Sequence, residues 1–304
     1  MQYTDLTNKK RKKIVSSDDV FNVGITAIAI VWLLIVLYPL VYIVSSSFSS
    51  GTAVTNGKVL LWPVDLSIDG YRIVFAHKAV WSGYANTFFY TVVGSIVAVI
   101  MVMLMAYPLS RKDFIGRKPI MTLIIVTMFF SGGLIPTYIL VSQMHLTNTR
   151  AVVIILGAFS TTHMIMMRTY FQSSIPGDLL EAAKLDGISD LGYLWRIIVP
   201  LSKPIVSVIL LYEIVGFWNS YFTPLIYIRD REMYPLQIIL REILSSATVD
   251  ASDLTDASLA ANLANQAEAM KYSLVVVATV PMLALYPFVQ KFFEKGVMIG
   301  SLKG

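Results

Sequence analysis

Long apolar stretches alternate with shorter polar segments along most of this chain. An α-helix needs about 20 apolar residues to cross a bilayer. We predict membrane-spanning helices at about residues 20–44, 84–109, 120–141, 151–171, 204–228 and 272–290. The first follows the basic run Lys9–Lys13, but it exceeds the apolar core of about 7–15 residues in a signal peptide, so we expect it to be retained as a span.

The composition supports this pattern. Of the 304 residues, 56% are hydrophobic and 14% are charged, whereas a soluble domain carries about 25% charged residues. We therefore predict an all-α, multi-pass membrane protein with six transmembrane helices. The chain has no cysteine, which excludes disulfides, thiolate metal sites and cysteine nucleophiles.

The distribution of basic residues predicts the orientation. Sixteen of the 24 lysines and arginines lie in alternate segments, which are 1–19, 110–119, 168–203 and the tail after 290. Because cytoplasmic loops carry the excess of basic residues, both termini are predicted to be cytoplasmic, and residues 1–19 form a basic cytoplasmic arm. This topology explains the net charge of +5 without a nucleic-acid partner.

The outer loop 229–271 is too long to be a simple turn. Its start, YPLQIILREIL, is apolar at helical spacing, and we expect it to lie at the membrane surface. The remainder is either a solvated linker or a contact with an external partner.

The inner segment 174–203 predicts two short helices. Ser174 is expected to cap the first, which Gly187 ends in the C′ position. Ser189 then begins a second helix, and Pro200 and Pro204 end it before the next span. Periodicity alone suits a docking element on the cytoplasmic face and an amphipathic loop on lipid headgroups equally well.

Within this segment, Glu181-Ala182-Ala183, Gly187, Ile197 and Val199-Pro200 resemble the EAA loop of ABC-importer permeases. The family pattern ends in Leu-Pro, and Val199 replaces that leucine here. Residues 133–150, 216–227 and 294–304 look like carbohydrate-importer permeases of the maltose type, in particular the Gram-positive permeases assigned to complex oligosaccharides. The resemblance covers residues 20–304.

This resemblance implies a type I ABC-importer (MetI-like) permease fold in a bacterial plasma membrane. A second permease subunit, expected to make a heterodimer, would lie alongside, with two ATPase subunits beneath and an extracellular solute-binding protein above. The ATPase-coupling residues that the resemblance implies are Glu181, Ala182, Ala183, Gly187 and Pro200. The small side chains of Ala182 and Ala183 would leave a surface onto which another protein packs closely.

Nucleotide chemistry is not expected on this chain. It has no G-x-x-x-x-G-K-[ST] sequence, so it cannot build a P-loop, and ATP with Mg²⁺ would be held by a partner ATPase. None of the three histidines begins an H-E-x-x-H sequence. We therefore predict a non-catalytic subunit with no cofactor or metal of its own.

Glu213 is the only acidic residue in a predicted span. Intramembrane carboxylates are costly and usually face protein or water. Glu213 is interpreted equally well as an acceptor for sugar hydroxyls, as a gating contact, or as a paired structural acid. His163 in the fourth span is expected to bond a neighbouring helix more readily than a substrate.

Polar and aromatic residues follow Glu213 along the fifth span. Gly216, Asn219 and Thr223 are expected to share a helix face, with Trp218 and Tyr221 beside it. Hydrogen-bonding groups and aromatic rings suit a sugar, and the resemblance places this part of the span on the transport path. Helix packing through Gly216 and an interfacial aromatic belt are the alternatives.

Together these observations predict the transmembrane permease subunit of an ATP-driven oligosaccharide importer in contact with membrane lipid. One alternative is the same machine for a non-sugar solute such as phosphate or a peptide. The other is a proton- or ion-coupled secondary transporter that uses Glu213.

Overall fold

Helices form the regular structure of the described chain. The computed structural model describes residues 17–252 and 257–301, and the one extended pairing within them is an isolated bridge between Ser49 and Leu66. The prediction of an all-helical protein is therefore confirmed. Most of the basic arm 1–19 and the last residues of the tail, 302–304, lie outside the described residues.

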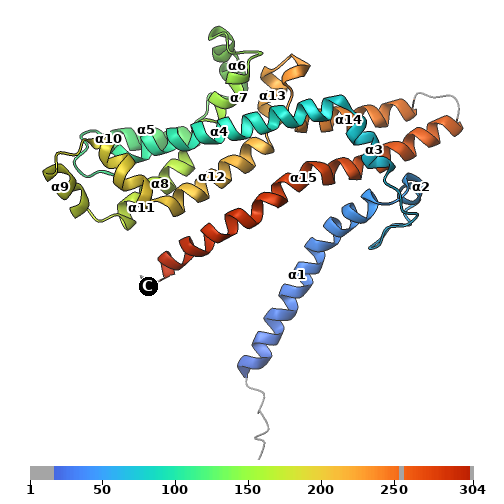
Figure 1. Ribbon diagram of the computed structural model, residues 1–304, viewed down its shortest axis with the longest axis horizontal. Coiled ribbons are helices and arrows are strands. Elements are labelled where there is room, and N and C mark those ends of the chain that lie inside the picture. The colour runs from blue at the N-terminus through green and yellow to red at the C-terminus, as the bar shows by residue number, and fades with distance from the viewer. Residues whose placement is uncertain (1–16, 253–256, 302–304) are drawn as a thin grey trace, which may run out of the picture.

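Three helices run without a break, and each contains a predicted span (Figure 1). They are α1 (Ser17–Ser47), α4 (Lys78–Ser110) and α15 (Ala257–Ser301). Their portions that are long and apolar enough to cross a membrane are Phe21–Ser47, Lys78–Ser110 and Ala264–Leu285.

Bends interrupt the third and fourth predicted spans, and another bend lies just before the fifth. The bends measure 116° between α5 (Arg117–Phe129) and α6 (Leu134–Gln143), 48° between α7 (Arg150–Gly157) and α8 (Thr161–Ser174), and 85° before α12 (Lys203–Trp218). Counting each bent pair as one span gives up to six, the predicted number. Local chemistry explains two of the breaks, because Gly133 takes a φ of +84° before α6 and Ser160 caps α8 by accepting from the His163 N–H.

Short helices gather at the two ends of α4 (Figure 1). One end carries α9 (Asp178–Leu185), α10 (Asp190–Tyr193), the π-helical turn η1 (Leu194–Ile198) and α11 (Val199–Leu201). The other end carries α2 (Gly51–Thr55), α3 (Asp69–Ala76) and α14 (Leu236–Ser252). Segments predicted to be cytoplasmic and segments predicted to be external thus lie at opposite ends of the molecule.

The apolar start of the outer loop lies inside the protein. Leu236, Ile239 and Ile243 of α14 are buried in a cluster with side chains of α3, α4 and α15. The expectation that this stretch lies at the membrane surface is therefore wrong. Its helical periodicity is real, but the apolar face packs against neighbouring helices instead of lipid.

One aromatic ring sits where three helices approach closely. Phe217 of α12 faces Gly94 of α4 and Gly157 of α7, and a Cβ built on either glycine would lie 2.5 or 2.6 Å from a ring carbon. Small residues at such positions let helices approach each other in membranes. The ring therefore fixes the spacing of α4, α7 and α12.

The segment predicted to be cytoplasmic, 174–203, shares its core with the spans. Met164 and Met167 of α8, Ile209 of α12 and Leu194 of η1 are all fully buried in one cluster with the last turns of α4. Because protein cores are close-packed and transmit displacement, a movement of the segment 174–203 would displace side chains of α4, α8 and α12.

Candidate functional site

The first helix of the segment 174–203 begins later than expected. Helix α8 continues through Ser174, Ile175 is extended before Pro176, and α9 starts at Asp178 without a side-chain cap. The prediction that Ser174 caps this helix is therefore wrong. A residue that precedes proline is biased away from helical backbone angles, so Ile175 ends α8.

The end of α9 is as predicted. Gly187 has a φ of +71°. Its N–H donates to the Lys184 carbonyl at 3.1 Å, and the Ile188 N–H donates to the Ala183 carbonyl at 2.9 Å. These two bonds are a Schellman motif, whose C′ residue is left-handed. The expected left-handed conformation of Gly187 is confirmed.

The second helix starts and ends as predicted. Ser189 Oγ accepts from the Gly192 N–H at 3.2 Å. Helical backbone continues through the π-helical turn to Leu201, one residue past Pro200, and the chain bends by 85° before α12, which holds Pro204 in its first turn, where the missing N–H costs nothing. The break at Ser202 thus lies between the two prolines, where the end of the helix is predicted.

Only part of the predicted coupling surface is open. Glu181 and Ala182 are exposed, whereas Ala183 is buried against the core. Ala183 therefore seats α9 on the spans and cannot receive a partner protein directly. Sequence reasoning missed Leu185, an apolar side chain that is 90% exposed beside the Gly187 turn.

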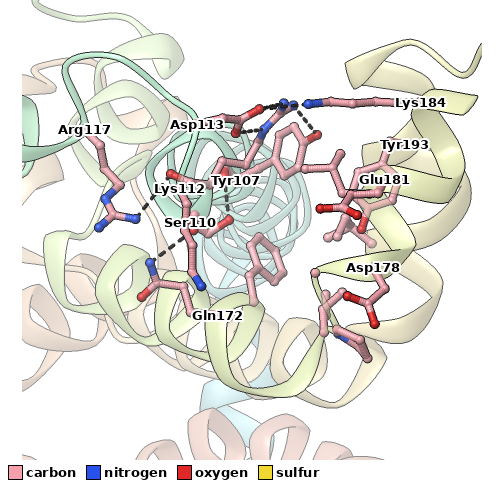
Figure 2. A pocket seen from close by; sticks show the side chains of 17 residues that line it. Tyr107, Ser110, Lys112, Asp113, Arg117, Gln172, Asp178, Glu181, Lys184 and Tyr193 are labelled. Atoms are coloured by element: carbon pink, nitrogen blue, oxygen red, sulfur yellow. Dashed lines mark hydrogen bonds and ion pairs between the residues drawn. The ribbon is translucent and has the colours of Figure 1, made fainter.

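A cavity of about 780 Å³ lies between α9, the end of α4 and the loop that leads to α5. Figure 2 shows ionic side chains bridging its rim. Arg111 Nε and Nη2 donate to the two carboxylate oxygens of Asp113 at 2.9 and 2.6 Å, and Lys184 Nζ donates to Asp113 at 3.0 Å. Arg111 Nη1 donates to the Tyr107 hydroxyl at 3.1 Å and also to Asp190.

This network shifts the titration of its members. Hydrogen bonds from Arg111 and Lys184 hold the pKa of Asp113 well below its usual range. The Asp113 carboxylate in turn raises the pKa of Arg111. Both groups therefore stay ionised at neutral pH.

Glu213 is paired inside the bundle. Its carboxylate is 2.6 Å from His163 Nδ1 and only 7% of the residue is exposed. His163 also stacks on Tyr212, with ring centroids 5.4 Å apart. Of the interpretations left open by the sequence, this geometry favours the paired structural acid for Glu213 and the interhelical bond for His163.

The remaining residues predicted on the substrate path divide between two environments. Trp218 is buried, and its Nε1 donates to the Ala278 carbonyl of α15 at 3.2 Å. Gly216, Asn219 and Tyr221 are exposed. The expectation that Gly216, Asn219 and Thr223 share one helix face is wrong, because α12 ends at Trp218 and Thr223 belongs to a separate helix, α13 (Phe222–Tyr227).

Residues 77–299 match the family of binding-protein-dependent transport system inner membrane components. The matched region is most of the chain. The protein belongs to this permease family. It is accordingly a membrane-embedded subunit of an ABC transporter, and the non-catalytic character of such subunits agrees with the missing P-loop.

Individual relatives extend over nearly the whole permease. It is 36% identical to the polygalacturonan/rhamnogalacturonan transport system permease protein YtcP of Bacillus subtilis (strain 168), over 93% of this chain and 98% of that protein. It is 37% identical to protein LplC of the same organism, over 89% and 90% of the two chains. A solved bacterial ABC transporter involved in the import of the acidic polysaccharide alginate matches with a TM-score of 0.82 and 35% identity, over 93% of this chain and 100% of that chain.

These similarities confirm the fold class, the membrane location and the family predicted from the EAA-like segment. The roles of individual residues in this permease stay predictions.

Proposed function

We propose that this permease forms half of the translocation path of an ATP-driven oligosaccharide importer and couples to separate ATPase subunits through α9. The observation that carries the proposal is the α9–Gly187–α10 turn. It projects at the end of α4 with Glu181, Ala182 and Leu185 exposed, while Ala183 joins it to the core of the spans.

The partners follow from this arrangement. Two ATPase subunits hold ATP and Mg²⁺, a second permease completes the path, and an external binding protein delivers the sugar. The apolar surface of α1 supports a further membrane-embedded partner or a lipid coat, because none of its best spanning window is buried within the described chain. Long exposed apolar surface in a membrane helix is covered by lipid or by another helix.

The substrate class proposed is an oligosaccharide that contains uronate units. Two of the relatives carry names that refer to acidic polysaccharides, polygalacturonan and alginate. The acidic residue of the fifth span, Glu213, is already bonded to His163, so it does not confront an anionic sugar with an unpaired carboxylate. At the outer end of that span, the Arg241 guanidinium lies 5.9 Å from the centre of the exposed Tyr221 ring, an arrangement suited to a carboxylated sugar ring.

Reconstitution of the complete importer in proteoliposomes tests this function. We expect uptake of labelled oligogalacturonides to require trapped ATP and the binding protein, and to continue when the proton gradient is collapsed. Maltodextrins of equal length serve as the neutral comparison. Uptake that follows the proton gradient and ignores ATP would instead support a secondary transporter.

The exposed and buried path residues allow a separate test. Asn219→Ala should impair uptake without loss of assembly, because its side chain is exposed and bonds only the Val215 carbonyl of its own helix among the described residues. Trp218→Phe is the matched variant, since it keeps a buried ring and removes one hydrogen bond to α15. Unchanged uptake by Asn219→Ala would place the sugar elsewhere.

A further inference from the structure

One side chain joins three separate pieces of the cytoplasmic end. Arg111 follows the last turn of α4, where it bonds the Tyr107 hydroxyl. Through Asp113 it is linked to Lys184 in the last turn of α9, and it bonds Asp190 directly at the first turn of α10. The two sides of the Gly187 turn are thus both tied to the end of α4, and Figure 2 shows the side that runs through Asp113 and Lys184.

The chemistry of this junction requires arginine. Its planar fork engages both carboxylate oxygens of Asp113 while the remaining nitrogen serves Tyr107 and Asp190. A lysine ammonium is a point charge without this fork. The Arg111 side chain is only 14% exposed, whereas the side chains of Asp113 and Asp190 are 45% and 67% exposed, so the arginine is buried in the protein while its carboxylate partners lie at the surface.

The helix tied to this junction reaches the opposite end of the protein. Helix α4 has 33 residues, which at 1.5 Å per residue makes it about 50 Å long. Near its other end, Asn86 donates to the carbonyls of Glu232 and Tyr234 at 2.6 and 3.0 Å. Thr87 Oγ1 accepts from the Leu236 N–H at 2.8 Å.

Among the helices whose side chains share a core with the α9–α10 turn, α4 alone runs unbroken from that turn to the outer segment within the described chain. Both α7–α8 and the stretch that leads into α12 are bent between the two ends. Elements that bend can absorb a displacement at the break, whereas an unbroken helix passes it along its axis. Helix α4 is therefore the direct mechanical connection between the α9–α10 turn and the outer segment 232–236.

We propose that Arg111 is a positioning residue that clamps the α9–α10 turn to α4, so that α4 carries a displacement of α9 to the outer segment 232–236. The inference rests on the proposed function, because it takes an ATPase on α9 as the source of the displacement. Arg111 touches neither sugar nor nucleotide in this mechanism.

The transport test uses the complete importer and the labelled sugar, oligogalacturonide or maltodextrin, that the wild type imports. Arg111→Gln should keep its ATPases attached and hydrolysing ATP, while the sugar imported per ATP falls by about fivefold or more, as for typical coupling between distant sites. Arg111→Lys should show the same loss, because it retains the charge without the fork. Lys112→Gln is the matched control, since this neighbouring exposed residue makes no ion pair within the described chain.

A distance measurement tests the clamp without any substrate. Because the chain has no cysteine, single cysteines introduced at Ile115 and Leu191, which are 95% and 63% exposed, accept spin labels without background from this chain. The distance distribution between the α4–α5 loop and α10 should be narrow in the wild-type complex and broad in Arg111→Gln.

The outcomes separate the two proposals. The clamp is overturned if Arg111→Gln imports as much sugar per ATP as the wild type, or if Arg111→Lys does so. It is also overturned if Lys112→Gln shows the same loss as Arg111→Gln, or if the distance distribution is unchanged in Arg111→Gln. If Arg111→Gln does not assemble, the exposed Asp190→Asn decides by the same ratio, with a loss supporting the clamp and a wild-type ratio overturning it. A wild-type importer without ATP-driven sugar uptake refutes the proposed function, while the distance measurement still decides the clamp.

Discussion

Two glycines in the segment 174–203 allow the free-energy cost of the left-handed backbone at the coupling turn to be measured separately from steric effects. Gly187 has a φ of +71°, and Gly177, just before α9, has a φ of −63°. A Cβ added to either glycine meets nothing within 4 Å. Substitution by alanine therefore introduces no steric clash at either site, and the two variants differ only in the backbone conformation that they must hold.

The magnitude follows from that difference. A left-handed conformation costs a residue with a Cβ about 1–2 kcal/mol, which reduces the population of the native turn roughly 5–30-fold relative to its alternatives. Gly187→Ala should show this loss, and Gly187→Val should show at least as much because of its β-branch. Gly187→Asn should be milder, since asparagine tolerates this region. Gly177→Ala should be neutral.

The assay is the affinity of the ATPase subunits for the purified permease pair, together with their stimulation by the loaded binding protein. We expect Gly177→Ala to keep the wild-type affinity and stimulation. Both quantities should then decrease progressively from Gly187→Asn to Gly187→Ala to Gly187→Val. Equal behaviour of the two alanine variants would refute the reasoning, because it would mean that the left-handed turn does not control how α9 presents itself.

Three further predictions concern other parts of the molecule. Glu213→Leu should lower the thermal stability of the purified permease clearly more than Glu213→Gln, because the leucine leaves the buried face of His163 without its partner while glutamine keeps a hydrogen bond; equal melting temperatures would contradict this. Gly94→Val should destabilise the permease because its Cβ would lie about 2.5 Å from the Phe217 ring, and Phe217→Ala in the same chain should recover part of the loss despite the cavity it makes; simple addition of the two losses in thermal unfolding would argue against the contact. Neighbouring basic groups lower the pKa of Asp113 in the folded protein. The ionised carboxylate therefore stabilises the fold fully at pH values above the pKa of an unfolded aspartate, near 4. This stabilisation is lost only as the pH falls towards the lower pKa of the folded state. The stability difference between wild type and Asp113→Asn should thus stay constant from about pH 8 to pH 5 and shrink below about pH 4, and a difference that declines already between pH 7 and pH 6 would assign the effect to another group.

Local chemistry along the chain predicted much of the architecture. Apolar length located up to six spans, and the basic residues predict which ends are cytoplasmic. At Gly187 and Ser189 the prediction held because turn and cap geometry depend on residues only three to five positions away, which the sequence displays directly.

Features that depend on tertiary packing could not be predicted in the same way. An apolar window does not reveal that Gly133 breaks its helix, and helical periodicity does not say whether an apolar face such as that of α14 meets lipid or protein. Ala183 and Ala182 are adjacent and identical, yet only the packed core decides that the first is buried. Arg111 and Asp190 are 79 positions apart, so their contact leaves no local pattern to detect.

The packing of α15 against the first helices sets an order of events during synthesis. Ser273 donates to the Ser47 carbonyl, 226 positions earlier, and the rings of Tyr42 and Tyr272 meet edge to face. At about 5–20 residues per second, a ribosome needs roughly 10–45 s to make the intervening chain. During that time α1 has no contact with α15, so these two helices pack together only late in translation. A ribosome that stalls before residue 257 leaves these contacts unmade.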